Sequence, residues 1–224
     1  MSLVPEVEWL GPTLPLYRYR AAAPGPTLLI QGGIHGDEVA GVHALEEMVE
    51  AGIALRAGML LVVPVMNKAA YRAGQRCRPG GLDLNRCFPG DPAAPEPERR
   101  LASVFMQLVQ QERPALMATL HESHKRYDPA VQPSFGQSIV YGVDPCPAVA
   151  AWVVERLNAE LSAPNEHWSA QHYPVATSST EVIVAATGCT GLCVETWMGF
   201  ALARRVAMQR RVVELLLQHY GALG

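Results

Sequence analysis

Residues 27–51 read TLLIQGGIHGDEVAGVHALEEMVEA, and this stretch decides the fold. It opens with a short apolar run at residues 27–31, which is long enough for a buried strand and is followed by two glycines. The next part, residues 37–51, has apolar side chains at helical spacing: Val39, Val42, Leu45 and Val49. A second apolar run, MLLVVPV, follows at residues 59–65. The stretch therefore predicts a strand, a helix and a strand in succession.

The rest of the chain repeats this alternation of strands and helices. The pattern predicts further helices at residues 96–112, 147–161 and 198–220. It predicts further strands at residues 115–120, 138–141 and 191–196. Proline-rich and glycine-rich segments fall between them as loops, at about 21–26, 79–97 and 128–137. The expected fold is an α/β sandwich with helices on both faces of a mixed, mainly parallel sheet.

The composition limits the size of the protein and its partners. The chain has 224 residues, 49% of them hydrophobic, which is enough for one globular domain with a sizeable core. The formal net charge is −3 and the basic side chains are scattered, so the sequence shows no electrostatic footprint for nucleic acid. No stretch approaches the roughly 18 to 20 apolar residues of a membrane helix. We expect a small molecule or a short peptide as the partner.

The location is predicted from the N-terminal residues and the cysteines. The first residues, MSLVPEVEW, lack the basic and apolar regions of a signal peptide. The five cysteines are odd in number and show no CxxC spacing, which is typical of a reducing compartment. We therefore expect a soluble, cytoplasmic protein.

Polar side chains follow two of the apolar runs, and a third run, at residues 191–196, contains Glu195. His35 and Glu38 follow the first run, and His121 directly follows the run at residues 115–120. In open α/β sheets the ligand site lies beyond the carboxyl ends of the strands, so these side chains are expected to meet. A helix that starts near residue 37 would let His35 and Glu38 turn toward one point. Two imidazoles and a carboxylate form a complete protein ligand set for one catalytic Zn²⁺, with a fourth position left for water.

Each of these residues also has an ordinary structural interpretation. A histidine beside glycines is typical of a turn, and Glu38 alone is typical of the first turn of a helix. Glu195 is harder to explain, because a carboxylate inside an apolar strand is costly unless it is paired, bound to metal or facing a cleft. It is our candidate for the group that takes a proton from an attacking water. His124 lacks the HExxH spacing and is expected at the rim of the site.

The segment at residues 67–90 is rich in glycine and carries four arginines: Arg72, Arg76, Arg78 and Arg86. A guanidinium group binds a carboxylate through two parallel hydrogen bonds, so such a loop beside a metal indicates a substrate that carries a carboxylate. The alternative is a solvated basic loop.

The order and spelling of these motifs resemble the zinc carboxypeptidase superfamily, and especially its deacylase branch, which contains aspartoacylase and succinylglutamate desuccinylase. GGIHGDE resembles the first metal motif of the family and TLHES the later strand-end motif. The resemblance implies that His35, Glu38 and His121 are the metal ligands. GLDLNRCFPG resembles the motif whose asparagine and arginine bind the substrate carboxylate, here Asn85 and Arg86.

Further roles follow from the same resemblance. Arg78 falls where the family places an arginine that polarises the scissile carbonyl, and CVETW resembles the strand that bears the general base, here Glu195. Carboxypeptidases place a mobile tyrosine about twenty residues before their base, and Tyr173 lies 22 residues before Glu195. The alternative for Tyr173 is a packed amphipathic side chain. The arginine that aspartoacylase-like enzymes have shortly before the base is missing from this sequence.

The resemblance implies a carboxypeptidase-like α/β/α sandwich. Because the sequence ends after one helix, we expect one catalytic domain, residues 1–224, without the C-terminal β-rich domain of aspartoacylase and succinylglutamate desuccinylase. The implied reaction is hydrolysis of an amide in a peptide or an N-acyl amino acid that bears a free carboxylate. Alternatives are an esterase, an amidase acting on cell-wall peptides, and a metal-binding domain without turnover. Glu195 and Arg78 argue against the last alternative, because a binding module needs neither.

Overall fold

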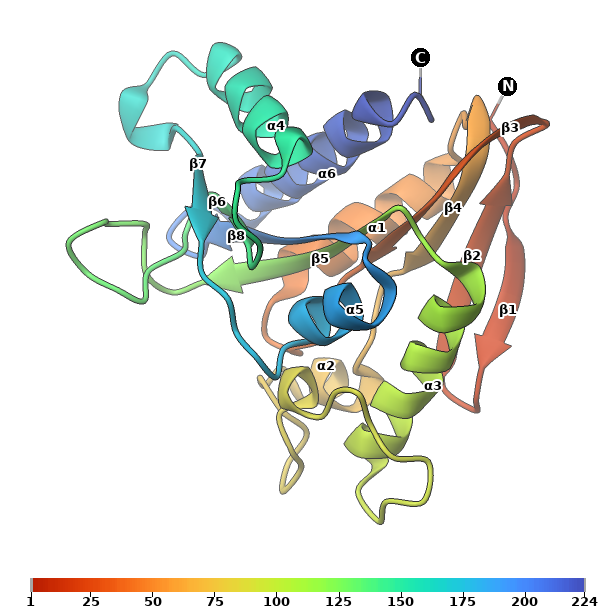
Figure 1. Cartoon of the computed structure of the whole chain (residues 1–224). Helices are drawn as coiled ribbons and strands as arrows, with labels where there is room; N and C mark the ends of the chain where they lie inside the picture. Colours follow the sequence, from red (N-terminus) through yellow and green to blue (C-terminus); the bar gives the residue numbers. More distant parts are fainter. Residues whose placement is uncertain (1, 224) are drawn as a thin grey trace.

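The computed structural model describes residues 2–223 and places eight strands of this range in one sheet (Figure 1). The strands are β1 (Glu6–Leu10), β2 (Leu14–Arg20), β3 (Ala23–Gln31), β4 (Ala57–Val63), β5 (Leu116–Ser123), β6 (Ser138–Tyr141), β7 (Ser169–His172) and β8 (Thr190–Trp197). Their order across the sheet is β1-β2-β4-β3-β5-β8-β6-β7. The central strands β4, β3, β5 and β8 are parallel, whereas β2 pairs antiparallel with β1 and β4, and β6 pairs antiparallel with β8.

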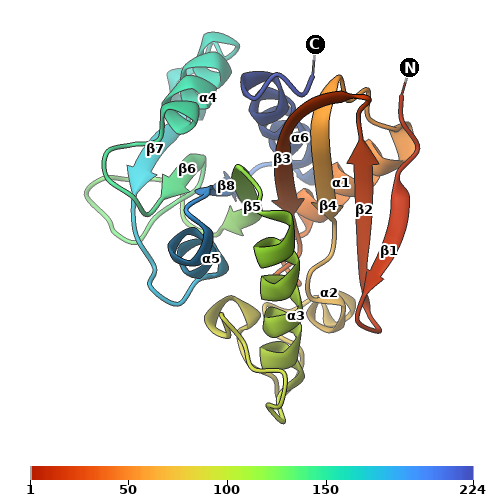
Figure 2. The ribbon, with the colours of Figure 1, turned by 45° about the vertical axis from the view of Figure 1, so that its right-hand side comes forward.

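Helices cover both faces of the sheet (Figure 2). One face carries α1 (Val39–Ala51), α4 (Ala148–Ala159) and α6 (Leu202–His219), and the other carries α3 (Pro97–Glu112) and α5 (Ser179–Thr187). The short helix α2 (Lys68–Ala73) follows the carboxyl end of β4. Two 3₁₀ turns, at Leu84–Arg86 and Pro164–Glu166, lie in the connections. The α/β sandwich with a mixed, mainly parallel sheet that the sequence predicts is confirmed.

The alternation of side chains along each strand decides which helix layer they meet. In β5 the side chains of Leu116, Ala118 and Leu120 pack in the core under α1, α4 and α6, and Met117 packs in the core under α3 and α5. His121 has the parity of Met117 and therefore faces the layer of α3 and α5. In β8 the side chains at 192 and 194 pack under α1, α4 and α6, so Glu195 also faces the α3 and α5 layer.

Several features of the fold differ from the expectations from sequence. The chain at residues 6–20 forms the hairpin of β1 and β2, to which no strand was assigned, and β3 includes most of the loop expected at 21–26. Helix α5 was also missed. Helix α1 begins at Val39, not near residue 37, and β5 continues past residue 120 so that His121 lies inside the strand. Within residues 2–223, each helix is too short or too polar to cross a membrane.

Candidate active site

His35 and Glu38 lie in the loop that joins β3 to α1. Glu38 comes just before α1, so the two side chains converge through the folding of the loop and not through helical spacing. Gly33 has a φ of +61°, a conformation in which any side chain would be strained. Gly36 packs so closely against Ala70 of α2 that a Cβ there would overlap the Ala70 carbonyl group. The glycines therefore allow the tight loop that points His35 toward Glu38.

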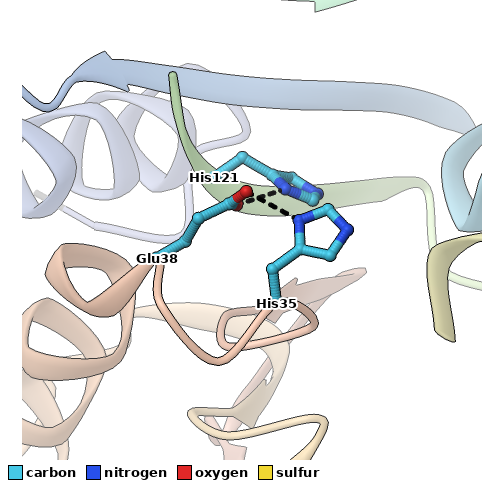
Figure 3. Close-up of side chains that lie close together, drawn as sticks. All are labelled: His35, Glu38 and His121. Carbon is cyan, nitrogen blue, oxygen red and sulfur yellow. Dashed lines mark hydrogen bonds and ion pairs between the residues drawn. The ribbon is translucent and has the colours of Figure 1, made fainter. Parts of the chain in front are cut away.

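His35, Glu38 and His121 form a buried cluster, in which the carboxylate lies between the two imidazoles (Figure 3). Nδ1 of His35 is 2.7 Å from Oε1 of Glu38, and Nδ1 of His121 is 2.7 Å from Oε2. One potential ligand atom from each residue lies within 4.8 Å of the others. The donors are those of a catalytic zinc site, and both ring nitrogens point at the same carboxylate. These three residues therefore fit a metal ion.

Asp83 supports this cluster from the opposite side of His35. Its Oδ1 lies 3.3 Å from Nε2 of His35, and its Oδ2 accepts a hydrogen bond of 2.9 Å from Arg76. A histidine that binds metal through one ring nitrogen commonly donates the other N–H to a carboxylate, which fixes the orientation of the ring. Asp83 meets that requirement for ligation through Nδ1. Asp83 belongs to the GLDLNRCFPG motif, but the sequence alone does not reveal this role.

The cluster shifts the pKa values of its members in opposite directions. Burial alone would lower the pKa of His35, but Glu38 and Asp83 raise it to about 9. Burial alone would raise the pKa of Glu38, yet the two imidazoles hold it well below its ordinary range. Burial lowers the pKa of His121. Without metal, the cluster therefore favours a proton on His35 and disfavours one on His121.

Zinc binding at pH 7 should release about one proton from the protein, because a metal-binding imidazole must be neutral and His35 carries a proton below about pH 9. Protons compete with the metal below that pH, so the affinity should rise about tenfold per pH unit up to near pH 9. Calorimetry in buffers of different ionisation enthalpy measures the proton release, and zinc-buffered competition measures the affinity. An affinity that is independent of pH between 7 and 9 would show that the metal displaces no proton from His35 in this range.

Glu195 lies beside this cluster because β5 and β8 are parallel neighbours in a register that pairs His121 with Glu195. Sγ of Cys193 donates a weak hydrogen bond of 3.6 Å to Oε1 of Glu195. No residue within 2–223 forms a hydrogen bond with Oε2. Burial and the negative charge of Glu38 raise the pKa of Glu195 to about 8. A carboxylate with a free oxygen and a raised pKa suits a general base.

A buried network holds His121 in place from the face of the sheet under α1 and α6. The carboxylate of Glu122 forms an ion pair with Arg205 of α6 and accepts a hydrogen bond of 2.9 Å from the backbone N–H of Ala40 in α1. Gln209 of α6 donates a hydrogen bond of 2.7 Å to the backbone carbonyl of His121. The strand that carries His121 is thus tied to both helices.

The cluster and Glu195 open into a pocket of about 370 Å³, and its wall includes Asn85 and Arg86. Oδ1 of Asn85 accepts a hydrogen bond of 2.8 Å from the backbone N–H of Ser179, so its amide NH₂ group is left for a ligand. Arg86 is exposed, and its guanidinium group has no acidic partner within residues 2–223. Both side chains can therefore donate to a carboxylate in the pocket.

Tyr173 and His124 also line the pocket. The ring of Tyr173 packs edge-on against Phe135, with 4.9 Å between the ring centroids. His124 is exposed and lies outside the cluster of His35, Glu38 and His121, at the rim where the sequence places it.

Arg78 does not line the pocket. Its Nε donates a hydrogen bond of 2.5 Å to the buried carboxylate of Glu98. Arg76 occupies the pocket wall, where its Nη1 lies 3.5 Å from Oε1 of Glu38. The sequence shows several arginines in this loop, but which of them reaches the site depends on acidic partners from distant segments.

Comparison with known proteins identifies the family. Residues 24–124 match the succinylglutamate desuccinylase/aspartoacylase catalytic domain. The chain belongs to the succinylglutamate desuccinylase/aspartoacylase family. It is 30% identical over 185 residues to the succinylglutamate desuccinylase of Burkholderia orbicola, a match that covers 74% of this chain and 52% of that protein.

Two further proteins are similar over different lengths. An N-alpha-acetyl-L-2,4-diaminobutyric acid deacetylase from Halomonas elongata is 42% identical over 90 residues, which are 38% of this chain and 25% of that protein. The cell shape determinant Csd4 of Helicobacter pylori, solved with bound product, has a TM-score of 0.84 at 20% identity, over 94% of this chain and 56% of that one. The last likeness shows the fold alone. The matches span about a quarter of the length of the deacetylase and about half of the length of the desuccinylase.

Proposed function

We propose that the protein is a zinc-dependent amide hydrolase whose substrate bears a free carboxylate. The observation that carries the proposal is the meeting of three groups of side chains in one pocket. These are the ligand set of His35, Glu38 and His121, the partly free carboxylate of Glu195, and the unpaired guanidinium group of Arg86. Membership of a family that contains deacylases supports the same reaction class.

One Zn²⁺ per chain would be held by the cluster, with Asp83 fixing the ring of His35. When bound, the ion supplies Lewis acidity and lowers the pKa of a water toward about 7. Glu195 takes a proton from the attacking water and delivers it to the leaving amine. The raised pKa of Glu195 favours both steps, because a base that titrates near neutral pH can accept a proton and then release it.

Asn85 and Arg86 bind the carboxylate of the substrate and thereby orient the scissile bond. Arg78 stays our prediction, from the family resemblance, for the donor that stabilises the oxyanion. Arg76 is a second candidate because it lines the pocket. Tyr173 lines the pocket, where it would contact the substrate and help to exclude water.

Two substrate classes fit these roles, an N-acyl amino acid and the C-terminus of a peptide. We favour the N-acyl amino acid, because both curated relatives are named as deacylases, one a deacetylase and one a desuccinylase. A solved relative at 22% identity is described as a D,L-carboxypeptidase, and it shares the fold. We also keep the cytoplasmic location as a proposal, which the free thiols of all five cysteines support.

The proposal is tested by screening the zinc-loaded protein against N-acyl amino acids, short peptides, cell-wall-type peptides and esters. We expect release of the amine from carboxylate-bearing amides, loss of turnover with a chelator, and recovery when Zn²⁺ is added back. Stoichiometric zinc without turnover of any substrate would contradict the proposal and would support the alternative of a metal-binding domain.

A further inference from the structure

The pocket also contains Glu181, whose carboxylate has no part in the reaction proposed above. Glu181 lies in the first turn of α5, where its backbone N–H donates a hydrogen bond of 3.2 Å to Oγ of Ser178. Its own carboxylate lines the pocket and makes neither a hydrogen bond nor an ion pair with any residue within 2–223. Burial raises the pKa of Glu181, an effect that the charge of the nearby His172 only partly offsets. A carboxylate that is partly desolvated without compensation is a site that a cation would stabilise.

The chain makes room for this carboxylate at Gly142, which follows β6. A Cβ at Gly142 would overlap the carboxylate oxygens of Glu181, so the absence of a side chain there allows Glu181 its position. The φ of Gly142 is not in the left-handed region, which means that alanine is compatible with the backbone at this position. Glycine at position 142 is therefore explained by the space that the Glu181 carboxylate occupies, and not by a positive φ.

Glu181 and Asn85 are linked through the first turn of α5. The backbone N–H of Ser179 donates to Oδ1 of Asn85, so the first turn of α5 is tied to the carboxylate-binding end of the pocket. Glu181 comes two residues later in that turn, about 3 Å further along the helix axis. With the carboxylate of an amino acid on Asn85 and Arg86, the side chain of that amino acid is the part of the substrate that we assign to Glu181.

We propose that Glu181 binds a cationic group on the side chain of the amino-acid half of the substrate, so that the preferred substrates are N-acyl derivatives of basic amino acids. The inference rests on the proposed function for the orientation of the substrate. In the same pocket, Arg86 reads the α-carboxylate and Glu181 reads an ammonium group. A neutral side chain of the same length would leave the Glu181 carboxylate unpaired.

The test compares amino acids with and without a terminal ammonium group. Lysine and ornithine carry a terminal ammonium group, and norleucine and norvaline are neutral analogues of similar shape. Equilibrium binding of these free amino acids to the zinc-loaded protein should favour the ammonium forms. Glu181→Gln should weaken binding of lysine by roughly 10 to 100-fold, the range for loss of one charged hydrogen bond, and should change norleucine binding by less than about 3-fold.

Two further variants separate charge recognition from a general effect on the fold. Gly142→Ala should displace the Glu181 carboxylate and reduce the preference for lysine, although it removes no charge. Glu155→Gln makes the same chemical change on the exposed side of α4, outside the pocket, and should leave the preference unchanged. All variants should bind zinc with the affinity of the unmodified protein.

The outcomes distinguish this inference from the proposed function. Equal binding of lysine and norleucine to the unmodified protein would overturn the inference, as would an equal loss of both with Glu181→Gln. In parallel, kcat/KM is measured for the Nα-acetyl derivatives of the same amino acids. If binding shows the Glu181-dependent preference but no derivative is hydrolysed, the charge recognition stands and the proposed hydrolysis fails.

Discussion

The Glu195→Gln variant is expected to lose kcat by roughly 10² to 10⁴-fold while it keeps zinc and most of its affinity for substrate. The amide has the shape of the carboxylate but cannot accept a proton from water at neutral pH. Glu195 does not belong to the cluster of His35, Glu38 and His121, and its Oε2 has no partner within residues 2–223. The substitution therefore removes the base and leaves that ligand set intact.

Zinc content, KM and kcat should be measured on the same preparation of this variant. Glu155→Gln, which makes the same change on an exposed helix face, serves as the matched control and should retain full activity. An unchanged kcat would remove Glu195 from the mechanism. Loss of zinc together with activity would make Glu195 a ligand, which its position beside His121 and Cys193 makes a real alternative.

The sequence predicts the central sheet well because buried parallel strands are apolar on both faces and helices show a regular apolar stripe. The hairpin at residues 6–20 has a weaker signal. Its β2 strand alternates between buried and partly exposed side chains, beginning at Leu14, and its turn contains Gly11 with a φ of +60°. Helix α5 begins with Ser178 and Glu181 at the spacing of a capping box, a signal that could have located it.

The site is harder to predict than the fold because its contacts join distant segments. The neighbouring positions of His121 and Glu195 depend on the register between β5 and β8, which no local pattern specifies. The partner of Arg78 is Glu98, twenty residues later, and the pairing keeps Arg78 off the pocket wall. From the sequence alone, Glu181 is an ordinary acidic residue in the first turn of a helix. The fold is needed to show that it lines the pocket.

Arg86→Lys is expected to lower kcat/KM for a substrate with a free carboxylate by roughly 10 to 150-fold. The guanidinium group offers two parallel hydrogen bonds at a fixed angle, and lysine keeps the charge but loses one bond and the geometry. One charged hydrogen bond contributes about 1.5 to 3 kcal/mol, which corresponds to this range. Arg86 is available for the role because it lines the pocket without an acidic partner within residues 2–223.

A double-difference cycle shows whether this loss comes from carboxylate recognition. An analogue whose carboxylate is converted to an amide should be a poor substrate for the unmodified protein, and Arg86→Lys should reduce its turnover little further. If Arg86 were part of a solvated basic loop, both substrates would respond weakly and alike. A coupling free energy near zero between the substitution and the carboxylate would therefore show that Arg86 does not read that group, and Asn85 would remain as its candidate donor in the pocket.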